Sequence, residues 1–411
     1  DKDGKFNLYA YDTVSNKTTQ VTKNRDWDIR WPSSDNQGHI IYERDGELET
    51  LDVGSKKTTR LAINVPNDGI NRRPRQAFVG NQISWYALSP KGERALFAAR
   101  GDIFTAPIEK GGTRNLTRSS DAHDRFPSWS PDGKTIAYLS DKSGNDEVWL
   151  AAQDGSTPPQ QLTTGGSEQR YAPVWSPDGK KIVFGDKNGK VYVVSVATKQ
   201  MQMIVDAPNG QIQDYDWSPK SGYIAYSLNG RNGVSSVYVW SAEENKNYRV
   251  TPEMFNAAGP TWDPSGGYLY FVSNREYAPM IGNTEFNYAS NRNSLIFALA
   301  LRKDGKNPFP NESDEVSIIE EKKDAPAISP TPVIEKVDFD GIEARVAKAP
   351  IGADNYGGIT AVKGHLIYST QSPFYYGRGP DTQPTVKVFS LKDRKETTLL
   401  TGSGGFSVSA D

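Results

Sequence analysis

A short phrase recurs along the chain, and this repetition constrains the fold more than any other feature. It stands at 125–134 as RFPSWSPDGK, at 170–180 as RYAPVWSPDGK and, in a more divergent form, at 213–222 as QDYDWSPKSG. Ser-Pro-Asp-Gly is a turn sequence, because proline presets φ at the first central position and glycine adopts a positive φ without strain. Each copy therefore predicts a strand that ends in a tight turn.

The residues after the turn predict three further strands. Residues 135–140, TIAYLS, alternate so that Ile136, Tyr138 and Ser140 share one face and Thr135, Ala137 and Leu139 the other. A second turn, DKSGNDE, leads to VWLAAQ, and PPQQLT follows as the last strand. Four antiparallel strands in about 40 residues are the size of one β-propeller blade.

The copies are spaced as blades would be. Alignment on Trp129 places the other copies at Trp31, Leu88, Trp175, Trp217, Trp262 and Thr360. The copies from Leu88 to Trp262 follow one another at intervals of 41 to 46 residues. Because no segment shows a sustained apolar period of 3.6 residues, a helical repeat is excluded. The predicted fold is all-β, a β-propeller of four-stranded antiparallel blades.

Both ends of the sequence predict incomplete blades. Residues 1–22 resemble 141–163, which is the second half of a blade, and GFSVSAD at the other end resembles RFPSWSPD, so that Asp411 would stand in a turn. Natural sheets avoid unpaired edge strands. We therefore expect the sequence to be a piece of a longer protein.

Composition narrows the classes of partner. The net charge of −2 argues against a nucleic-acid partner or an anionic membrane surface. The chain contains no cysteine, which excludes disulfides, a thiolate nucleophile and a zinc–sulfur site. No run of 18 apolar residues occurs, so no membrane span is expected. The compartment, cytoplasm or periplasm, stays open.

Two segments interrupt the repeat. Residues 61–80 are rich in Pro, Asn and Gly and stand between two blades. The second irregularity runs from about 277 to 333 and ends in a charged, proline-rich stretch. Part of it is expected to carry the outer strands of its blade, and the rest is expected to be a solvated loop or lid.

The ordered series of motifs resembles the propeller portion of the tricorn serine peptidases (peptidase S41 type). The resemblance rests on residues 101–150, on TPEMFNAAGPTWDPSGGYLYFVSNREY at 251–277, and on EKVDFDGIEARVAKAPI at 335–351 followed by LKDRKETTLL. It covers essentially the whole chain in consecutive order. The SPDG turn alone is less specific, since TolB-type (PD40) propellers also use it.

The resemblance implies a domain organisation. Residues 1–66 would be the last one and a half blades of an upstream six-bladed propeller. Residues 74–411 would be a seven-bladed propeller with the insertion at about 277–333 and an incomplete last blade. The catalytic Ser, His and Glu of the family would lie beyond residue 411. The family also implies oligopeptide substrates and a homo-oligomeric full-length protein.

An independent search for chemistry predicts no catalytic residue, cofactor or metal. The three histidines, His39, His123 and His365, are scattered, and no Gly-x-Ser-x-Gly motif accompanies a serine. The first residues, DKDG, resemble a calcium loop that lacks its closing Glu. The repeated tryptophans could form a carbohydrate platform, but at one fixed blade position packing between neighbouring sheets is favoured.

Function is expected where the copies differ, in the segments that precede each first strand. These supply the candidate substrate-binding residues Asp124, Arg125, Arg170, Tyr171, Asp214 and Tyr215. Arginine and tyrosine at a funnel mouth suit an extended peptide, through carboxylate pairing and stacking. The alternative is that Arg125 and Arg170 pair with acids on adjacent blades.

Three functional classes follow from the sequence. The first is a non-catalytic propeller that guides or filters oligopeptides toward a peptidase domain. The second is a TolB-like propeller for protein–protein interaction. The third, a sugar-binding or lyase-type propeller, is disfavoured because it would require a metal or a histidine cluster in the tunnel.

Overall fold

The computed structural model describes residues 4–70, 78–207, 210–275, 280–281, 288–289, 292–310, 336–373, 379–380 and 382–409. The regular elements among these residues are strands, apart from the short 3-10 helices Gly80–Gln82 and Ile342–Ala344. The chain divides into two compact units, Asp1–Ala77 and Phe78–Asp411.

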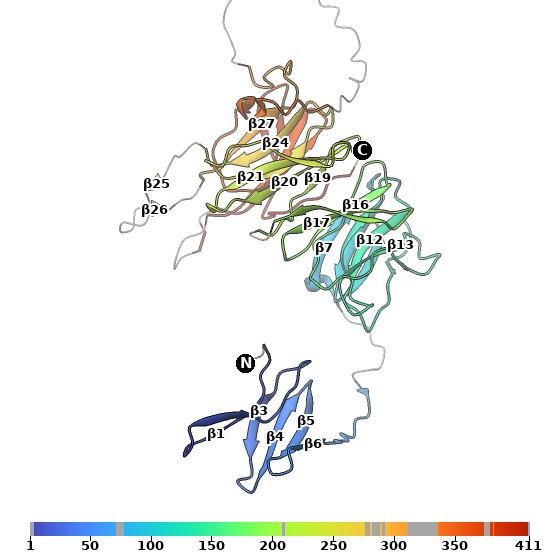
Figure 1. The fold of residues 1–411 in the computed structure, drawn as a ribbon. Coiled ribbons are helices and arrows are strands. Elements are labelled where there is room, and N and C mark those ends of the chain that lie inside the picture. Colours follow the sequence, from blue (N-terminus) through green and yellow to red (C-terminus); the bar gives the residue numbers. More distant parts are fainter. Residues whose placement is uncertain are drawn as a thin grey trace, which may run out of the picture. The chain divides into compact units, whose positions relative to one another are not determined.

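The first unit is one small sheet and a hairpin (Figure 1). The hairpin pairs β1 (Tyr9–Asp12) with β2 (Lys17–Gln20), and the sheet contains, in order, β3 (Arg30–Ser34), β4 (His39–Arg44), β5 (Glu47–Asp52) and β6 (Lys57–Arg60). Its buried core consists of Ile29, Tyr42 and Leu51. Trp31 is 82% exposed.

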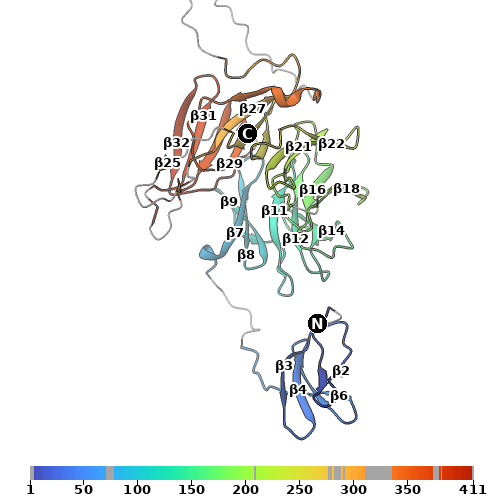
Figure 2. The ribbon, with the colours of Figure 1, turned by 60° about the vertical axis from the view of Figure 1, so that its left-hand side comes forward.

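The second unit contains six four-stranded antiparallel sheets among the described residues, here called sheets 1 to 6 in chain order (Figures 1 and 2). Sheet 1 contains β7 (Ile83–Leu88), β8 (Arg94–Ala99), β9 (Asp102–Pro107) and β10 (Arg114–Asn115). Sheet 2 contains β11 (Arg125–Trp129), β12 (Thr135–Ser140), β13 (Glu147–Ala152) and β14 (Gln160–Gln161). Sheet 3 contains β15 (Val174–Trp175), β16 (Lys181–Gly185), β17 (Lys190–Ser195) and β18 (Met201–Asp206).

The remaining three sheets follow the same plan. Sheet 4 contains β19 (Asp216–Trp217), β20 (Tyr223–Asn229), β21 (Ser235–Ser241) and β22 (Lys246–Arg249). Sheet 5 contains β23 (Ala257–Trp262), β24 (Tyr268–Ser273), β27 (Leu295–Ala300) and β28 (Val346–Lys348). Sheet 6 contains β29 (Tyr356–Val362), β30 (His365–Thr370), β31 (Thr385–Ser390) and β32 (Lys395–Thr401). The predicted all-β propeller architecture is confirmed.

The insertion in sheet 5 is described only in part. Between β24 and β27 the chain forms the short pair β25 (Met280–Ile281) and β26 (Tyr288–Ala289). The predicted outer strand at SLIFALAL is present as β27. The proline-rich stretch predicted to be a loop or lid lies at 311–335, outside the described residues.

The second strand of sheet 2 is buried on both faces because sheets 1 and 3 lie on either side of it. In β12, Ile136 and Tyr138 belong to a core cluster shared with sheet 1. Ala137 and Leu139 belong to a cluster shared with sheet 3, which includes Phe184. The alternation seen in the sequence therefore separates two cores, one toward each neighbouring sheet.

The repeated tryptophans join neighbouring sheets, as predicted. Trp175, Trp217 and Trp262 are each at most 8% exposed. The indole Nε1 of Trp175 donates to the carbonyl oxygen of Ser128 in sheet 2 at 3.3 Å. Trp217 and Trp262 make the equivalent bonds to Val174 (3.2 Å) and Asp216 (3.1 Å) in the preceding sheet. This packing is expected of aromatic residues that bury their rings and satisfy one polar atom.

Strand register corrects two positions of the repeat. Trp129 pairs with Ile136, the second residue of its neighbouring strand. In the first unit the residue at this position is Ser34, opposite Ile40, so the alignment that placed Trp31 there was wrong. In sheet 6 it is Ala361, opposite Leu366, rather than Thr360. The shift arises because the turn that follows is shorter: the paired positions are seven residues apart at Trp129 and Ile136, six at Ser34 and Ile40, and five at Ala361 and Leu366. Trp31 instead matches Phe126, since each follows an arginine and the two have φ angles of 52° and 51°.

The C-terminal described residues lie between sheets 6 and 1. The carbonyl oxygen of Gly404 accepts a hydrogen bond from Gln371 Nε2 at 3.1 Å, next to the end of β30. The Oγ of Ser407 accepts one from the backbone N–H of Leu88 in β7 at 3.2 Å. These contacts join the last part of the chain to the first sheet of the second unit. The turn predicted at Asp411 lies outside the described residues.

Candidate functional site

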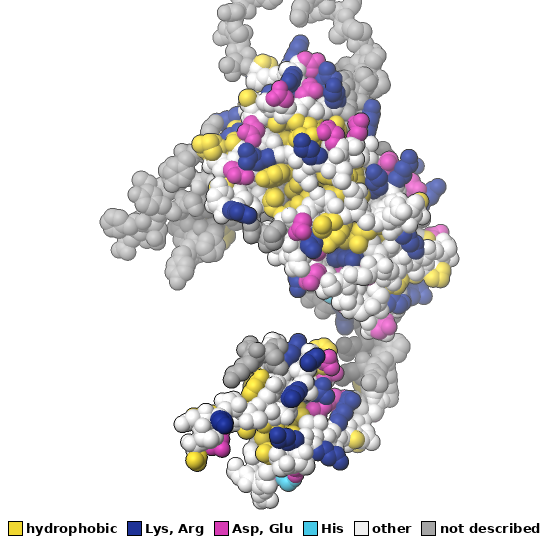
Figure 3. All heavy atoms as spheres, viewed as in Figure 1, with side chains coloured by type: hydrophobic (Ala, Val, Ile, Leu, Met, Phe, Trp, Pro, Cys, Tyr) yellow, Lys and Arg dark blue, Asp and Glu magenta, His cyan; other side chains and the backbone are white. Residues whose placement is uncertain are grey.

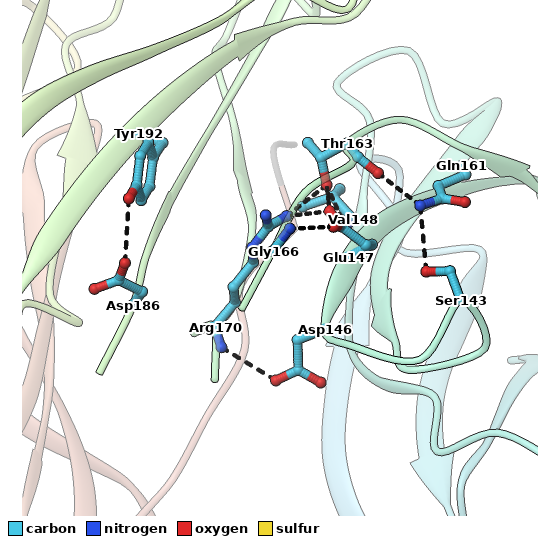
Figure 4. A network of polar contacts seen from close by, with 10 residues as sticks. All are labelled: Ser143, Asp146, Glu147, Val148, Gln161, Thr163, Gly166, Arg170, Asp186 and Tyr192. Carbon is cyan, nitrogen blue, oxygen red and sulfur yellow. Dashed lines mark hydrogen bonds and ion pairs between the residues drawn. The ribbon is translucent and has the colours of Figure 1, made fainter. Parts of the chain in front are cut away.

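The segment that enters β15 holds a buried arginine (Figure 4). Arg170 is 5% exposed, and its Nη1 lies 2.5 Å from Glu147 Oε2 and 2.6 Å from Thr163 Oγ1. Its guanidinium also stands over the ring of Phe184, 4.9 Å from the centroid. The arginine of sheet 3 is thereby bound to the acid of sheet 2.

A glycine allows the loop before this arginine to pass close to it. A Cβ atom at Gly166 would lie 2.8 Å from Arg170 Nη2 and 2.8 Å from the carbonyl oxygen of Asp146. The amide of Gly166 donates to Glu147 Oε1 at 2.6 Å. Glu147 therefore accepts bonds on both oxygens, and its charge is fully used inside the protein.

The second candidate arginine is also neutralised. Arg125 Nη2 lies 2.5 Å from both carboxylate oxygens of Asp146, within the same sheet. Asp146 Oδ2 additionally accepts the backbone N–H of Arg170 at 3.1 Å. Asp146 and Glu147 thus bring Arg125 and Arg170 into one network (Figure 4 shows its Arg170 part). Arg170 pairs across adjacent sheets, as the alternative interpretation described.

The third residue of this region, Asp124, is 2% exposed. It accepts a hydrogen bond from the hydroxyl of Ser119. Its backbone N–H donates to the carbonyl oxygen of Gly101 in sheet 1 at 2.9 Å. Asp124 therefore fixes the connection between sheets 1 and 2 through these two hydrogen bonds.

The two candidate tyrosines differ in exposure. Tyr215 is 5% exposed, and its hydroxyl donates to the carbonyl oxygen of Ala172 at 2.5 Å. Burial raises the pKa of Tyr215. Tyr171 is half-buried, and its backbone N–H donates to the carbonyl oxygen of Gly185 at 2.9 Å. Tyr215 thus ties the entry of sheet 4 to the entry of sheet 3.

Two carboxylates at the start of sheet 4 accept hydrogen bonds from backbone N–H groups of sheet 5. Asp214 Oδ2 accepts the backbone N–H of Gly259 at 3.0 Å, while its Oδ1 accepts that of Ser227 at 3.0 Å. Asp216, which the sequence did not single out, accepts the backbone N–H of Trp262 at 3.1 Å. Although part of its surface is accessible, desolvation raises the pKa of Asp216 to about 6.

The axis of the second unit carries an apolar cavity of about 530 Å³. Its walls come from the first strands of sheets 1 and 2, from the entry of sheet 3, and from the C-terminal segment. The aromatic walls are Trp85, Tyr86, Phe126, Trp129 and Phe406. Trp85 and Phe126 meet edge to face with their centroids 5.2 Å apart. Because the first strand of a propeller blade faces the axis, this cavity belongs to the axial channel.

The indole N–H of Trp129, in the wall of this cavity, differs from those of the other repeated tryptophans. In sheets 3, 4 and 5 the corresponding indole N–H bonds the preceding sheet, but Trp129 Nε1 is buried without a partner in the described part of the chain. The aromatic rings of the cavity suit a short extended peptide.

Two further cavities lie where the first strands begin, and the first of them is predominantly polar. One, of about 600 Å³, is lined by Lys187, Gly210, Gln211, Gln213, Asp214, Ser227 and Asn229. The other, of about 400 Å³, lies between sheets 5 and 6, and it includes Gly259, Ser273, Asn274, Gly357 and Gly358. Glycines expose backbone groups that could bond a peptide.

Comparison with known proteins identifies this arrangement. Residues 83–411 match the family model described as the tricorn protease second beta propeller domain. The chain belongs to this family. The resemblance noted in the sequence is therefore confirmed, and the second unit is the propeller region of a tricorn-like protease.

Relatives match along the whole chain. A tricorn protease homolog of Saccharolobus solfataricus is 24% identical over 100% of this chain and 36% of that protein. The tricorn protease of Thermoplasma volcanium is 23% identical over 100% of this chain and 39% of that protein. The crystal structure of the tricorn protease matches with a TM-score of 0.69 at 16% identity, over 99% of this chain and 39% of that one. The tricorn-like chain spans less than half the length of these relatives.

Other site chemistry in the tricorn-like propeller is limited. No group of three or more His, Asp or Glu side chains that could hold a metal occurs among the described residues. In the same part of the chain, no helix is long and apolar enough to cross a membrane. On the face shown in Figure 3, Lys and Arg side chains are interspersed with Asp and Glu.

Sequence reasoning missed the partners of its candidate residues. The acids Asp146 and Glu147 stand in the segment DKSGNDE, which the sequence predicted only as a turn, and they are 8% and 3% exposed. The aromatic residues Trp85 and Tyr86 stand in ISWYALSP, a copy that lacks the tryptophan of the repeat. The missing tryptophan was the feature of the sequence that could have indicated this site. Substrate binding by the six predicted residues stays a prediction.

Proposed function

We propose that the second unit guides or filters oligopeptides toward the peptidase domain of a tricorn-like serine peptidase. The observation that carries the proposal is the axial cavity walled by Trp85, Tyr86 and Phe126. Aromatic side chains bind peptide segments with little dependence on sequence. A conduit requires this tolerance, because it must pass many substrates.

The affinity of a conduit must be low. Contacts along an open channel wall support binding in roughly the micromolar to millimolar range, and tighter capture would prevent release. The buried arginines Arg125 and Arg170 are poor candidates for steering, since Asp146 and Glu147 already neutralise them. The aromatic wall is the better candidate for contact with the substrate.

We further propose that residues 405–409 begin the first strand of a seventh blade. The bond from the Leu88 N–H to Ser407 repeats that from the Ala361 N–H to Thr261 Oγ1 at 3.4 Å, and that from Trp262 to Asp216. In both of those cases the acceptor belongs to the first strand of the preceding sheet. Ser407 thus stands where the first strand of a sheet before sheet 1 would stand. This supports the seven-bladed organisation, with the first unit as part of an upstream propeller.

Peptide binding by the chain tests the proposed conduit. A labelled, unstructured peptide of about a dozen residues, an extended length that spans several blade entries, should bind with weak affinity in fluorescence anisotropy. Trp85→Ala combined with Tyr86→Ala should weaken binding several-fold. Trp27→Ala, which removes an aromatic side chain 55% exposed on the first unit, is the matched control.

Peptide cleavage by the full-length enzyme tests the proposal through activity. The Trp85→Ala/Tyr86→Ala variant should slow cleavage of long peptides and leave tripeptide-sized reporters nearly unchanged. Absence of peptide binding, or equal weakening by the Trp27 control, would contradict the conduit. In that case a TolB-like protein-docking role would be the better account.

A further inference from the structure

Another guanidinium in the unit, that of Arg275, stands over aromatic rings with no acid paired to it among the described residues. Arg275 follows β24, and its Cζ atom lies 5.9 Å from the ring centroid of Phe255, 5.4 Å from that of Phe271 and 5.0 Å from that of Phe297. Phe271 and Phe297 are at most 4% exposed. Three rings around one cation hold the guanidinium in place.

The polar partners of this guanidinium are few. Its Nε donates to Ser273 Oγ in a long bond of 3.4 Å. Its Nη2 is buried and has no hydrogen-bond partner in the described part of the chain. Among the described residues no carboxylate forms an ion pair with it. Desolvation lowers the pKa of Arg275, because burial disfavours the charged form.

Such an arrangement is costly unless a ligand completes it. A buried donor without an acceptor loses its hydration, and a desolvated charge without a counter-charge loses more. Arg170 shows the completed version in the same protein, with a guanidinium over Phe184 and the carboxylate of Glu147 on its Nη1. Arg275 has the rings, and within the described ranges no carboxylate lies on it.

Arg275 is one hydrogen bond away from the 400 Å³ cavity between sheets 5 and 6. Ser273, which accepts its Nε–H, lines that cavity together with the backbone of Gly259, Gly357 and Gly358. These glycines belong to the first strands of the two sheets, so the cavity faces the axial channel. Arg275 does not itself line this cavity: its guanidinium stands over Phe271 and Phe297, which pack toward sheet 4. The residue as a whole is partly exposed, which leaves a route of approach at the strand ends.

We propose that Arg275 binds a carboxylate of a peptide in the axial channel, supplied either by an acidic side chain or by the C-terminus. This inference rests on the proposed conduit and adds to it one recognised chemical group. The planar guanidinium presents paired N–H donors that match the two oxygens of a carboxylate. The channel would then have an aromatic wall at sheets 1 and 2 and a single anion site at sheet 5.

Three peptides of one neutral sequence separate the sources of the carboxylate. The first has an amidated C-terminus and no acid, the second has a free C-terminus, and the third is amidated and contains one Glu. Whichever carboxylate is recognised should improve binding about tenfold over the neutral peptide in anisotropy titrations, as expected for a hydrogen bond to a charged group. Arg275→Gln should abolish that advantage and leave the neutral peptide unchanged.

Control variants separate the charge from the packing. Arg275→Met keeps an apolar side chain against the rings and should behave like Arg275→Gln. Arg302→Gln, which removes a surface arginine paired with Asp304 at 2.8 Å, should have no effect. Equal affinity of all three peptides for the wild-type chain would overturn the anion site while leaving the conduit intact.

Acetate tests the anion site independently of any peptide. Exchange of chloride for acetate at constant ionic strength should raise the melting temperature of the wild-type chain more than that of Arg275→Gln and Arg275→Met. If no peptide bound, the conduit would fail and the acetate result would still decide the anion site. Identical responses of the three proteins would overturn it.

Discussion

Arg170 and Arg275 are the same residue in similar surroundings, yet the structure treats them differently. Both guanidinium groups stand about 5 Å from a buried phenylalanine ring, at 4.9 Å from Phe184 and 5.0 Å from Phe297. Arg170 has Glu147 as its partner, while Arg275 has a serine and a buried Nη2 that no described residue bonds. The charge of one arginine is paired within the fold, and that of the other has no counter-charge among the residues that the structure describes.

The indole N–H groups of the repeated tryptophans show the same difference between paired and unpaired donors, without a charge. Trp217 donates its indole N–H to Val174, while Trp129, at the same position of the repeat, has no partner in the described residues. A repeat places equivalent side chains in equivalent positions. Whether each side chain finds its partner depends on the neighbouring sheet. The positions without a partner are therefore where a ligand can contribute most.

Removal of the acid beside Arg170 should have the largest effect. Glu147→Gln keeps the shape of the side chain but leaves a buried cation unpaired, so we expect the free energy of unfolding to fall by about 3 kcal/mol. Chemical denaturation followed by fluorescence measures it. The double variant Glu147→Gln/Arg170→Met should recover most of the loss, since it buries no charge. Failure to recover would mean that packing, not charge, holds this junction.

Asp216 should make stability depend on pH in an unusual direction. Its folded pKa of about 6 lies above the reference value of 3.8, so its contribution to stability is full below about pH 4 and is lost as the pH rises through about 6. Relative to Asp216→Asn, the wild-type chain should lose about 1–2 kcal/mol between pH 4 and 7. Denaturation curves at a series of pH values measure the difference. Parallel pH profiles of the two proteins would count against a strained carboxylate at the junction of sheets 4 and 5.

The matched tryptophans predict a smaller difference. Trp217→Phe removes a hydrogen bond between sheets, whereas Trp129→Phe removes an N–H that has none in the described residues. Beyond the loss of ring volume common to both, Trp217→Phe should cost about 1 kcal/mol more. Urea denaturation of the two variants compares them directly. An equal or larger loss for Trp129→Phe would show that its N–H is already bonded.

The smallest change in the free energy of unfolding is expected at an exposed ion pair. Lys187 and Glu168 lie 3.1 Å apart with side chains 51% and 31% exposed. Lys187→Gln should change the free energy of unfolding by less than about 0.5 kcal/mol, because water screens the pair. A loss as large as that of Glu147→Gln would remove burial as the explanation of the first prediction. Thermal denaturation is sufficient to detect it.

The sequence predicted the fold from local signals. Turns such as Ser130-Pro-Asp-Gly133 form as their composition requires, with Gly133 at a φ of +70°. Strand positions and the packing role of the tryptophans followed from the repeat. The register at Ser34 and Ala361 did not, because the turns after these residues are shorter than the turn after Trp129, and the resulting pairing is visible only in the paired strands.

The amino-acid sequence by itself determined the repeated four-strand unit, its turns and the absence of cysteine chemistry, since each depends on neighbours within a few residues. Only the tertiary structure decided which charges are neutralised. Arg170 meets Glu147 from 23 residues away and from another sheet, while Arg275 meets three phenylalanine rings and no acid among the described residues. Burial and pairing of charge depend on the approach of separate sheets, and a linear pattern does not record that approach.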